Sequence, residues 1–441
     1  MRPSLSLLLL LGLGAALVAA LVAPPASWGA APAPRPGAEI PDTLVFTPLP
    51  PDTLTPIEEH HRKHHDDEDE EWMSARIGDR LITDRDQWRA RGSHTGTWSA
   101  YADYNRVDRL RFAAGYELQV RDPMAPRLGG RLEYADGRDQ LLYGFQIEQP
   151  IIPPGRISIG ASLVRRTDHH ELQQVSDFEN TVALLLARHD YRDYWEREGE
   201  GVYLAWRVPD FSTVSLHLRR DEYRTLVSHG ATSWLNRDAE LRPNPPIEDG
   251  TANTLSLRLD KGARTTIHTR AGTYHWLEAE WAGGSLGGDF TYTRLLGDLR
   301  GVLRLSPATT LMLRGVAGTT TSGRLPPQLA FPLGGPDGLR AHDFAQYHGE
   351  QVALMQAEYI IGLWKLRTGA FEGGLHAIAF VDAGAAWNDP EHHWSIGDRQ
   401  IEMDGGFGLA AAEDKLRVYF AKDLHRTDSP FVITLRLQRP F

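Results

Sequence analysis

The densest group of residues able to bind a metal ion lies between Glu58 and Glu71. If this segment were helical, two histidine pairs would have the i,i+4 spacing that can present two imidazoles to one ion: His60 with His64, and His61 with His65. The surrounding run of aspartate and glutamate is also typical of a solvated, disordered charge cluster. Because nothing nearby builds a defined cage, the sequence favours the solvated cluster. Metal binding is the weaker alternative, and no cofactor is expected.

A second pattern has the spacing of a nucleophilic site. Residues 283–287 read Gly-Gly-Ser-Leu-Gly and match G-x-S-x-G, a motif that needs a strand before the serine and a helix after it. Here strand-like runs lie on both sides, Trp276 to Trp281 and Phe290 to Leu295, so a glycine-rich hairpin turn is expected. The sequence therefore predicts that the chain is not an enzyme, with an esterase at Ser285 as a weak alternative.

The composition excludes several classes of site and partner. None of the 441 residues is cysteine, which removes disulfides, thiolate metal sites and cysteine nucleophiles. The absence of thiols also fits passage through an oxidising periplasm. The net charge of −11 and the lack of a long basic run argue against nucleic acid as a partner.

The N-terminal region predicts export. Residues 1–31 combine Arg2, an apolar stretch from Leu5 to Ala23 and a small-residue exit, as a secretory signal peptide does; an uncleaved anchor is the alternative. Residues 32–95, with their proline-rich and His/acidic segments, are expected to form a disordered linker. No later stretch has the length of a transmembrane helix, so the exported chain would be periplasmic, secreted or embedded as a closed barrel.

Residues 96–441 contain repeated short runs of period two, which is the pattern of strands with two different faces. Leucines alternate with polar residues in 214–218 and 255–259, and Arg258, Arg314 and Arg417 recur on the face opposite the leucines. An arginine-bearing interior suggests a wide, wet lumen. The rival is a soluble sandwich, whose inward positions would be apolar.

The end of the chain supports the barrel. In 431–441 apolar residues fall on one face and polar residues on the other, and the run ends on Phe441, as many bacterial outer-membrane barrels do. The predicted fold is all-β: a transmembrane antiparallel β-barrel of about sixteen strands, since single-chain bacterial barrels have even strand numbers.

One segment has helical rather than strand periodicity. Between Glu171 and Arg188 the apolar residues recur at helical spacing: Leu172, Val175, Phe178, Val182, Leu185 and Leu186. This predicts a short amphipathic helix between two strands. It could plug the barrel mouth or lie on the membrane surface, but packing against the barrel is favoured.

Residues 331–441 carry five ordered elements. They are Phe331-Pro-Leu-Gly-Gly-Pro-Asp-Gly-Leu-Arg340, then Gly349-Glu350 with a strand ending Ala357-Glu358-Tyr359, then Phe380-Val-Asp-Ala-Gly-Ala-Ala-Trp387, then 405–409, and finally the closing strand. In order and spacing they resemble the bacterial surface-antigen barrel of the BamA/TamA superfamily, here expected without N-terminal periplasmic polypeptide-binding modules. The resemblance implies a protein of the cell outer membrane of a Gram-negative-type bacterium, acting in outer-membrane biogenesis or in protein insertion or translocation. A passive porin-like channel or a structural surface protein is the alternative.

The resemblance also implies an inward-loop lock. In that family a long loop, here near residues 322–350, folds into the lumen, and its arginine is held by an aspartate of a Phe-x-Asp motif. This implies that Arg340 pairs with Asp382, behind the glycines Gly334 and Gly335. Alternation independently places Phe380 on the same face as Asp382. Glu358 is a second acceptor if it points inward, and the alternative is an exposed Arg340 with a hydrated Asp382.

The remaining implications concern the seam and the partners. The first and last strands of such a barrel would pair weakly and template or admit an incoming strand, with Phe441 at the seam. The expected partners are outer-membrane lipids and lipopolysaccharide, the cellular barrel-assembly machinery for the chain's own insertion, and a possible polypeptide client. One departure is local: the family's Arg-Gly-aromatic sequence is replaced by Arg340-Ala341-His342.

Overall fold

Every residue described below belongs to one unit of the chain, Ile77–Phe441. The computed structural model of the protein describes residues 88–91, 96–118, 122, 124–152, 156–208, 212–235, 240–261, 271–368, 371–389, 391–392, 394–397, 399–411, 416–426 and 428–437. The predicted signal peptide, nearly all of the predicted linker, the four histidines His60, His61, His64 and His65, and Phe441 lie outside these residues.

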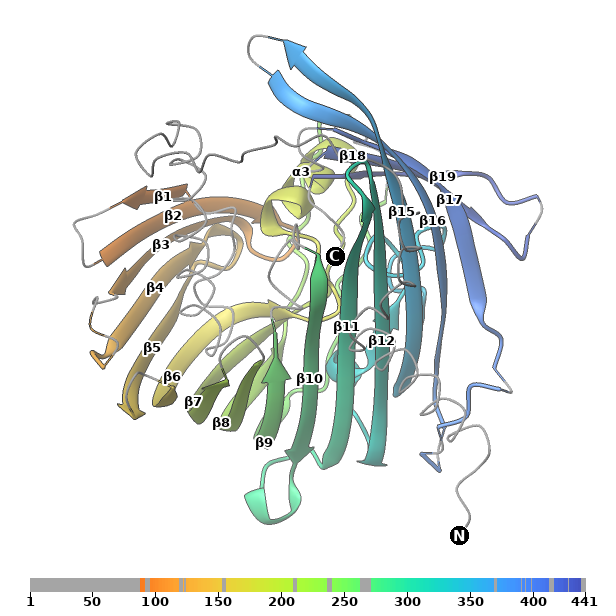
Figure 1. Ribbon diagram of the computed structural model, residues 1–441. Helices are drawn as coiled ribbons and strands as arrows, with labels where there is room; N and C mark the ends of the chain where they lie inside the picture. The colour runs from red at the N-terminus through yellow and green to blue at the C-terminus, as the bar shows by residue number, and fades with distance from the viewer. Residues whose placement is uncertain are drawn as a thin grey trace, which may run out of the picture. The chain divides into compact units, whose positions relative to one another are not determined.

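The described chain is nearly all β-structure. One antiparallel sheet contains β1 (Trp88–Arg91), β2 (Gly96–Asn105), β3 (Arg109–Leu118), β4 (Arg127–Ala135), β5 (Gln140–Ile152), β6 (Ile157–His169), β7 (Tyr194–Val208), β8 (Ser212–Thr225), β9 (Gly250–Asp260), β10 (Gly272–Ala282), β11 (Tyr292–Ser306), β12 (Thr309–Gly323), β15 (Gln351–Thr368), β16 (Phe371–Trp387), β17 (Glu402–Ala411), β18 (Leu416–Asp423) and β19 (Val432–Arg436). Each strand pairs with the next strand of this series, so the strands follow one another around a curved wall (Figure 1). Apart from the four-residue β1, the described sheet has sixteen strands, which confirms the predicted number.

The outward face of the wall is apolar. Ile159, Leu204, Leu216 and Leu257 are direct register partners on four successive strands. Their side chains are 44–51% exposed. Ser215 and Ser256, one position away, are buried on the inner face. Such a continuous apolar row is suited to lipid and would be a liability in water, so the predicted alternation and the membrane-facing surface are confirmed.

The two ends of the wall differ in their connections. The long connections 170–193, 226–249 and 324–350 all leave from one end of the strands, whereas at the other end β11 and β12 are joined by the two-residue turn 307–308. Outer-membrane barrels carry long loops outside the cell and short turns on the periplasmic side. We therefore assign the end with the long connections, called the loop end below, to the cell exterior.

The interior differs from the wide, wet lumen expected from the sequence, and that expectation is wrong for the described part of the chain. Arg314 and Arg417 are buried and pair with carboxylates: Arg314 lies 2.9 Å from Asp298, and Arg417 lies 2.8 Å from Glu358. Phe331, from the connection 324–350, is also buried, within the apolar cluster of the interior. The reason is that long connections fold inward and fill the space, which strand alternation cannot indicate.

The predicted helix is present but shorter than its apolar pattern. Helix α3 spans Asp177–Ala187 and begins after Ser176, whose side chain accepts a hydrogen bond from the Glu179 amide. Glu179 is buried and Phe178 is exposed, whereas a helix that docks through an apolar face would bury the phenylalanine. The reason is that the inner side of α3 meets charged groups of the barrel. Among the described residues, no helix is long and apolar enough to span a bilayer.

Candidate functional site

The connection between β12 and β15 folds into the interior, as predicted for a loop near 322–350. It contains a 3-10 turn η3 (Pro327–Leu329) and the short antiparallel pair β13 (Phe331–Leu333) and β14 (Tyr347–Gly349). We call residues 324–350 the inward loop. Leu339, like Phe331, is fully buried within the apolar interior, so the loop packs as part of the protein core rather than resting on the barrel mouth.

Two glycines shape the turn that carries Arg340. Gly334 and Gly335 have φ angles of 117° and 84°, which glycine adopts at no steric cost. A Cβ atom on Gly334 would lie 2.4 Å from the carbonyl oxygen of Asp343. The Gly335 amide donates to the carbonyl oxygens of Leu339 (3.0 Å) and His342 (3.2 Å). The chain therefore turns back on itself here and projects the Arg340 side chain towards the wall.

Arg340 contacts the wall through all of its guanidinium nitrogens. Nε and Nη2 donate to the two carboxylate oxygens of Asp382, each at 2.8 Å, and Nη1 donates to Oε1 of Glu358 at 2.5 Å. The guanidinium carbon also lies 4.0 Å from the centre of the Phe380 ring, within cation–π range. The structure thus brings together the residues that the resemblance implied, and their role as a lock remains a proposal.

Two residues of this group were missed from the sequence. On β18, Arg417 donates to Oε2 of Glu358 at 2.8 Å, and the Tyr419 hydroxyl donates to Oε1 at 2.9 Å. The alternation of 416–420 placed Arg417 on the inner face, but nothing in a single sequence indicates which strand lies opposite. Two arginines and two carboxylates balance in charge, which is the condition for burying such groups. Burial acts to lower the pKa of Arg340, but the charges of Asp382 and Glu358 raise this pKa above its usual value.

Asp337, also missed, connects the inward loop to two other parts of the chain. Its Oδ2 accepts hydrogen bonds from the amides of Gln174 (2.6 Å) and Val175 (2.8 Å), just before α3. Its Oδ1 lies 3.1 Å from Arg436 on the last strand, β19. The inward loop is therefore joined to the helix segment and to the final strand at one residue.

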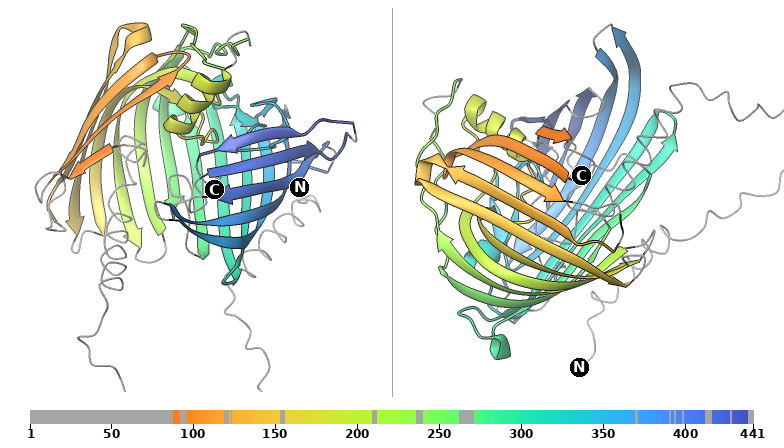
Figure 2. Two further views of the ribbon diagram at one scale, coloured as in Figure 1. Left: turned by 90° about the horizontal axis from the view of Figure 1, so that it is seen from above. Right: turned by 90° about the vertical axis from the view of Figure 1, so that its left-hand side faces the viewer.

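Helix α3 lies between the first and last strands of the wall (Figures 1 and 2, yellow between orange and blue). On one side the Thr181 hydroxyl accepts from the Tyr104 amide (2.9 Å) and donates to the Tyr104 carbonyl oxygen (3.3 Å) on β2. On the other side Glu179 pairs with Arg436 and accepts from the Leu437 amide at 3.2 Å. Within the described residues, the strand registers end with β1–β2 and β18–β19, and none joins β19 to β1 or β2. We call this gap, spanned by α3, the seam.

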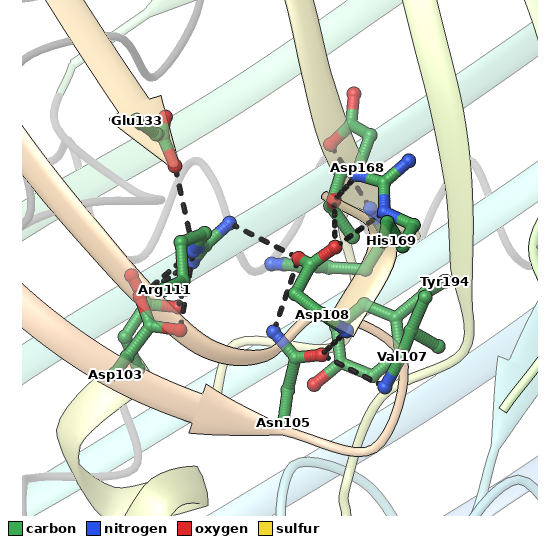
Figure 3. A network of polar contacts seen from close by, with 12 residues as sticks. Asp103, Asn105, Val107, Asp108, Arg111, Glu133, Asp168, His169 and Tyr194 are labelled. Carbon is green, nitrogen blue, oxygen red and sulfur yellow. Dashed lines mark hydrogen bonds and ion pairs between the residues drawn. The ribbon is translucent and has the colours of Figure 1, made fainter. Parts of the chain in front are cut away.

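The β2 side of the seam is held by a polar network (Figure 3). Arg111 pairs with Asp103 at 2.7 Å and lies 3.4 Å from Glu133, and it also lies 3.8 Å from Asp177 at the start of α3. In the β2–β3 turn, the Asn105 side chain accepts from the Asp108 amide at 2.7 Å. The end of β2 is therefore fixed to the wall and to α3 by charged side chains. Strand alternation alone could not predict which of these side chains pair.

The other predicted residues lie apart from this group. Ser285 is exposed in the turn η2 (Gly284–Leu286) between β10 and β11, as expected for a hairpin, and no helix follows it. Phe441 and the histidines His60, His61, His64 and His65 lie outside the described residues.

Comparison with known proteins agrees with this architecture. Residues 235–418 match the Omp85 superfamily domain. The fold is similar to the crystal structure of BamA from Haemophilus ducreyi lacking POTRA domains 1–3, with a TM-score of 0.51, 13% identity, and coverage of 79% of this chain and 74% of that chain. At that identity the likeness establishes the fold alone.

Two further solved structures share less of their length with the chain. CdiB from Acinetobacter baumannii has a TM-score of 0.41 and 13% identity, covering 77% of this chain and 58% of that chain. CdiB from Escherichia coli has a TM-score of 0.43 and 12% identity, covering 78% of this chain and 62% of that chain. No curated protein matches the chain by sequence.

Proposed function

We propose that this chain inserts or translocates polypeptide segments at the seam between β2 and β19. The proposal is supported by the BamA-like fold and the match to the Omp85 superfamily domain, which indicate a BamA/TamA-type outer-membrane β-barrel. This role belongs to outer-membrane biogenesis. The signal peptide at 1–31 would direct export, 32–95 would be a linker, and 96–441 would form the barrel.

The observation that carries the proposal is how the strand edges at the seam are satisfied. An unpaired strand edge is costly in lipid, because each free amide and carbonyl group needs a partner. At Tyr104 both groups are taken by the Thr181 side chain, and the Leu437 amide is taken by Glu179. Side chains of α3 thus occupy positions where a neighbouring strand would form its ladder, and an incoming polypeptide strand would replace them.

The partners follow from this role. Lipid and lipopolysaccharide would contact the apolar outer face, and the cell's barrel-assembly machinery would insert the protein itself. The client would be an extended polypeptide, because a strand edge recognises main-chain groups of any sequence. Nucleic acid is not expected as a partner, because the net charge is −11 and the sequence has no long basic run.

A passive channel is the competing function, and the interior disfavours it. Phe331 and Leu339 are fully buried, and Arg340 is 2% exposed, so the inward loop fills the space that a steady pore would leave to water. A wider conducting path would form if the loop left its ion pairs with Asp382 and Glu358.

The test combines conductance with the composition of the outer membrane. In planar bilayers the purified protein is expected to show small, infrequent conductance, which increases in Arg340→Ala because the inward loop is released. Deletion of the gene is expected to lower the amounts of a subset of outer-membrane proteins. A large, steady pore that Arg340→Ala leaves unchanged, with unaltered outer-membrane proteins after deletion, would rule out the proposal in favour of a porin-like channel.

A further inference from the structure

A second group of ionisable side chains gathers at the tip of the inward loop, next to the Arg340 lock. It is centred on His342, the residue that replaces the aromatic position of the family motif. Two wall strands face it: β17 contributes Glu402 and Asp404, and β18 contributes Asp423. The group lies where β17 begins and β18 ends, near the loop end of the barrel.

Asp404 orients the imidazole. Its Oδ2 accepts a hydrogen bond from the Ala341 amide at 2.6 Å, and its Oδ1 lies 3.0 Å from Nδ1 of His342. Asp404 is fully buried, so its carboxylate has a fixed position. A carboxylate on one ring nitrogen fixes the tautomer of a neutral histidine and directs the lone pair of the other nitrogen, an arrangement typical of metal-binding histidines.

The other ring nitrogen faces two carboxylates across a gap. Nε2 of His342 lies 3.9 Å from Oε2 of Glu402 and 4.0 Å from Oδ2 of Asp423. Both distances are too long for hydrogen bonds. One donor atom from each of the three residues lies within 4.8 Å of the others. Donors bound to one zinc ion at about 2.0–2.2 Å lie roughly 3–3.5 Å apart, so a small contraction would bring all three onto one ion.

The charge balance of the group also favours a cation. The side chains of Glu402, Asp404 and Asp423 are 14%, 0% and 10% exposed, and they surround one imidazole. Two other basic groups lie at similar distances, Arg426 at 3.8 Å from Asp423 and His425 at 3.9 Å from Glu402, but their side chains are 78% and 43% exposed and therefore hydrated. Like charges this close repel when poorly hydrated, and a divalent ion removes the repulsion.

We propose that His342 Nε2, Glu402 and Asp423 bind one divalent transition-metal ion, with Asp404 holding the imidazole from behind. One nitrogen and two oxygen donors suit Zn²⁺ or Mn²⁺, whereas Ca²⁺ prefers oxygen donors alone. The bound ion would fasten the tip of the inward loop to β17 and β18, two residues beyond Arg340. This site is independent of the proposed function, because it requires only the barrel and the loop.

A competing arrangement has a proton in place of the metal. The hydrogen bond to Asp404 raises the pKa of His342, against the opposing effect of burial, and a protonated imidazole would itself offset part of the carboxylate charge. The two arrangements differ in one measurable respect, since only the first one binds an ion with a defined stoichiometry.

The test is isothermal titration calorimetry of the full-length, chelator-treated protein in detergent with Zn²⁺, Mn²⁺ and Ca²⁺. Because His60, His61, His64 and His65 could bind zinc independently, the same titrations are made on a variant with all four replaced by glutamine. In that background we expect one Zn²⁺ or Mn²⁺ ion per chain. His342→Gln or Glu402→Gln should weaken binding at least 100-fold, and Asp404→Asn should weaken it about 10–100-fold.

The matched control is His229→Gln, because His229 bonds to the Val107 carbonyl oxygen at 2.8 Å, apart from the cluster, and should leave binding unchanged. Heat-modifiable gel migration shows whether each variant is folded. The proposal is overturned if no saturable binding occurs in the four-histidine variant, or if His342→Gln binds the ion as tightly as its parent while remaining folded.

Discussion

Replacing Arg340 with alanine is expected to release the inward loop and to lower the free energy of unfolding of the barrel by about 3–5 kcal/mol. The change leaves the fully buried Asp382 carboxylate with the neutral Gln356 amide, 3.2 Å away, in place of a bidentate guanidinium. Glu358 keeps Arg417 and Tyr419 as partners, so most of the loss should arise at Asp382. Urea unfolding in lipid vesicles measures the stability, and limited proteolysis of 324–350 measures release of the loop.

The control for this experiment lies at the start of the same loop. Arg324 pairs with Glu248 at 2.6 Å, but both side chains are exposed, so Arg324→Ala should cost only about 0–1 kcal/mol. Arg340→Lys keeps the charge but cannot form the two-pronged contact, and should fall between the two. If Arg340→Ala and Arg324→Ala have equal small effects, Arg340 does not hold the loop.

The double substitution Glu179→Gln and Thr181→Val is expected to detach α3 from the seam. Thr181→Val leaves the Tyr104 amide and carbonyl without their described side-chain partner, at a cost of about 1–3 kcal/mol. Glu179→Gln removes one of the two carboxylates that face the buried Arg436; Asp337 remains as its partner, so the loss should be about 1.5–3 kcal/mol. Hydrogen exchange measured by mass spectrometry should show faster exchange in 177–187 and in β2, with β7 and β8 unchanged.

Phe178→Ser provides the comparison, since Phe178 is 55% exposed on the same helix and its side chain has no polar group that could satisfy a strand edge. It should leave exchange in β2 unchanged. Equal exchange in β2 for the double variant and the unaltered protein would mean that α3 does not protect the strand edge.

How far the sequence could predict this architecture depends on the range of each interaction. The wall was predictable because alternation is local: Leu257 faces outward and Ser256 inward for the same reason in any strand. The contact of Arg340 with Asp382 was implied by a family resemblance, and alternation added only that Asp382 shares a face with Phe380. Neither source could show that Arg417 of β18 meets Glu358 of β15, because two strands separate them in the wall and alternation does not indicate how the wall curves.

The expectation of a wet lumen was wrong for a related reason. An inward arginine gives the same alternating pattern whether it faces water or a carboxylate, so Arg314 could not reveal its partner Asp298. Helix α3 was predictable as a helix, but its apolar pattern could not show that Glu179 and Thr181 contact strands at opposite ends of the chain. Docking of long loops is decided by side chains that the loop meets only after folding.

The most direct test of whether α3 separates β2 from β19 is cysteine cross-linking at the seam in intact outer membranes. The chain has no cysteine, so each introduced pair is unique. With a short bismaleimide, the pairs Tyr104→Cys with Thr181→Cys, and Glu179→Cys with Leu437→Cys, should cross-link efficiently. The pair Tyr104→Cys with Val432→Cys, which joins β2 directly to β19, should not. Efficient cross-linking of that last pair, with none between α3 and either strand, would show that the two strands pair directly and would contradict the account.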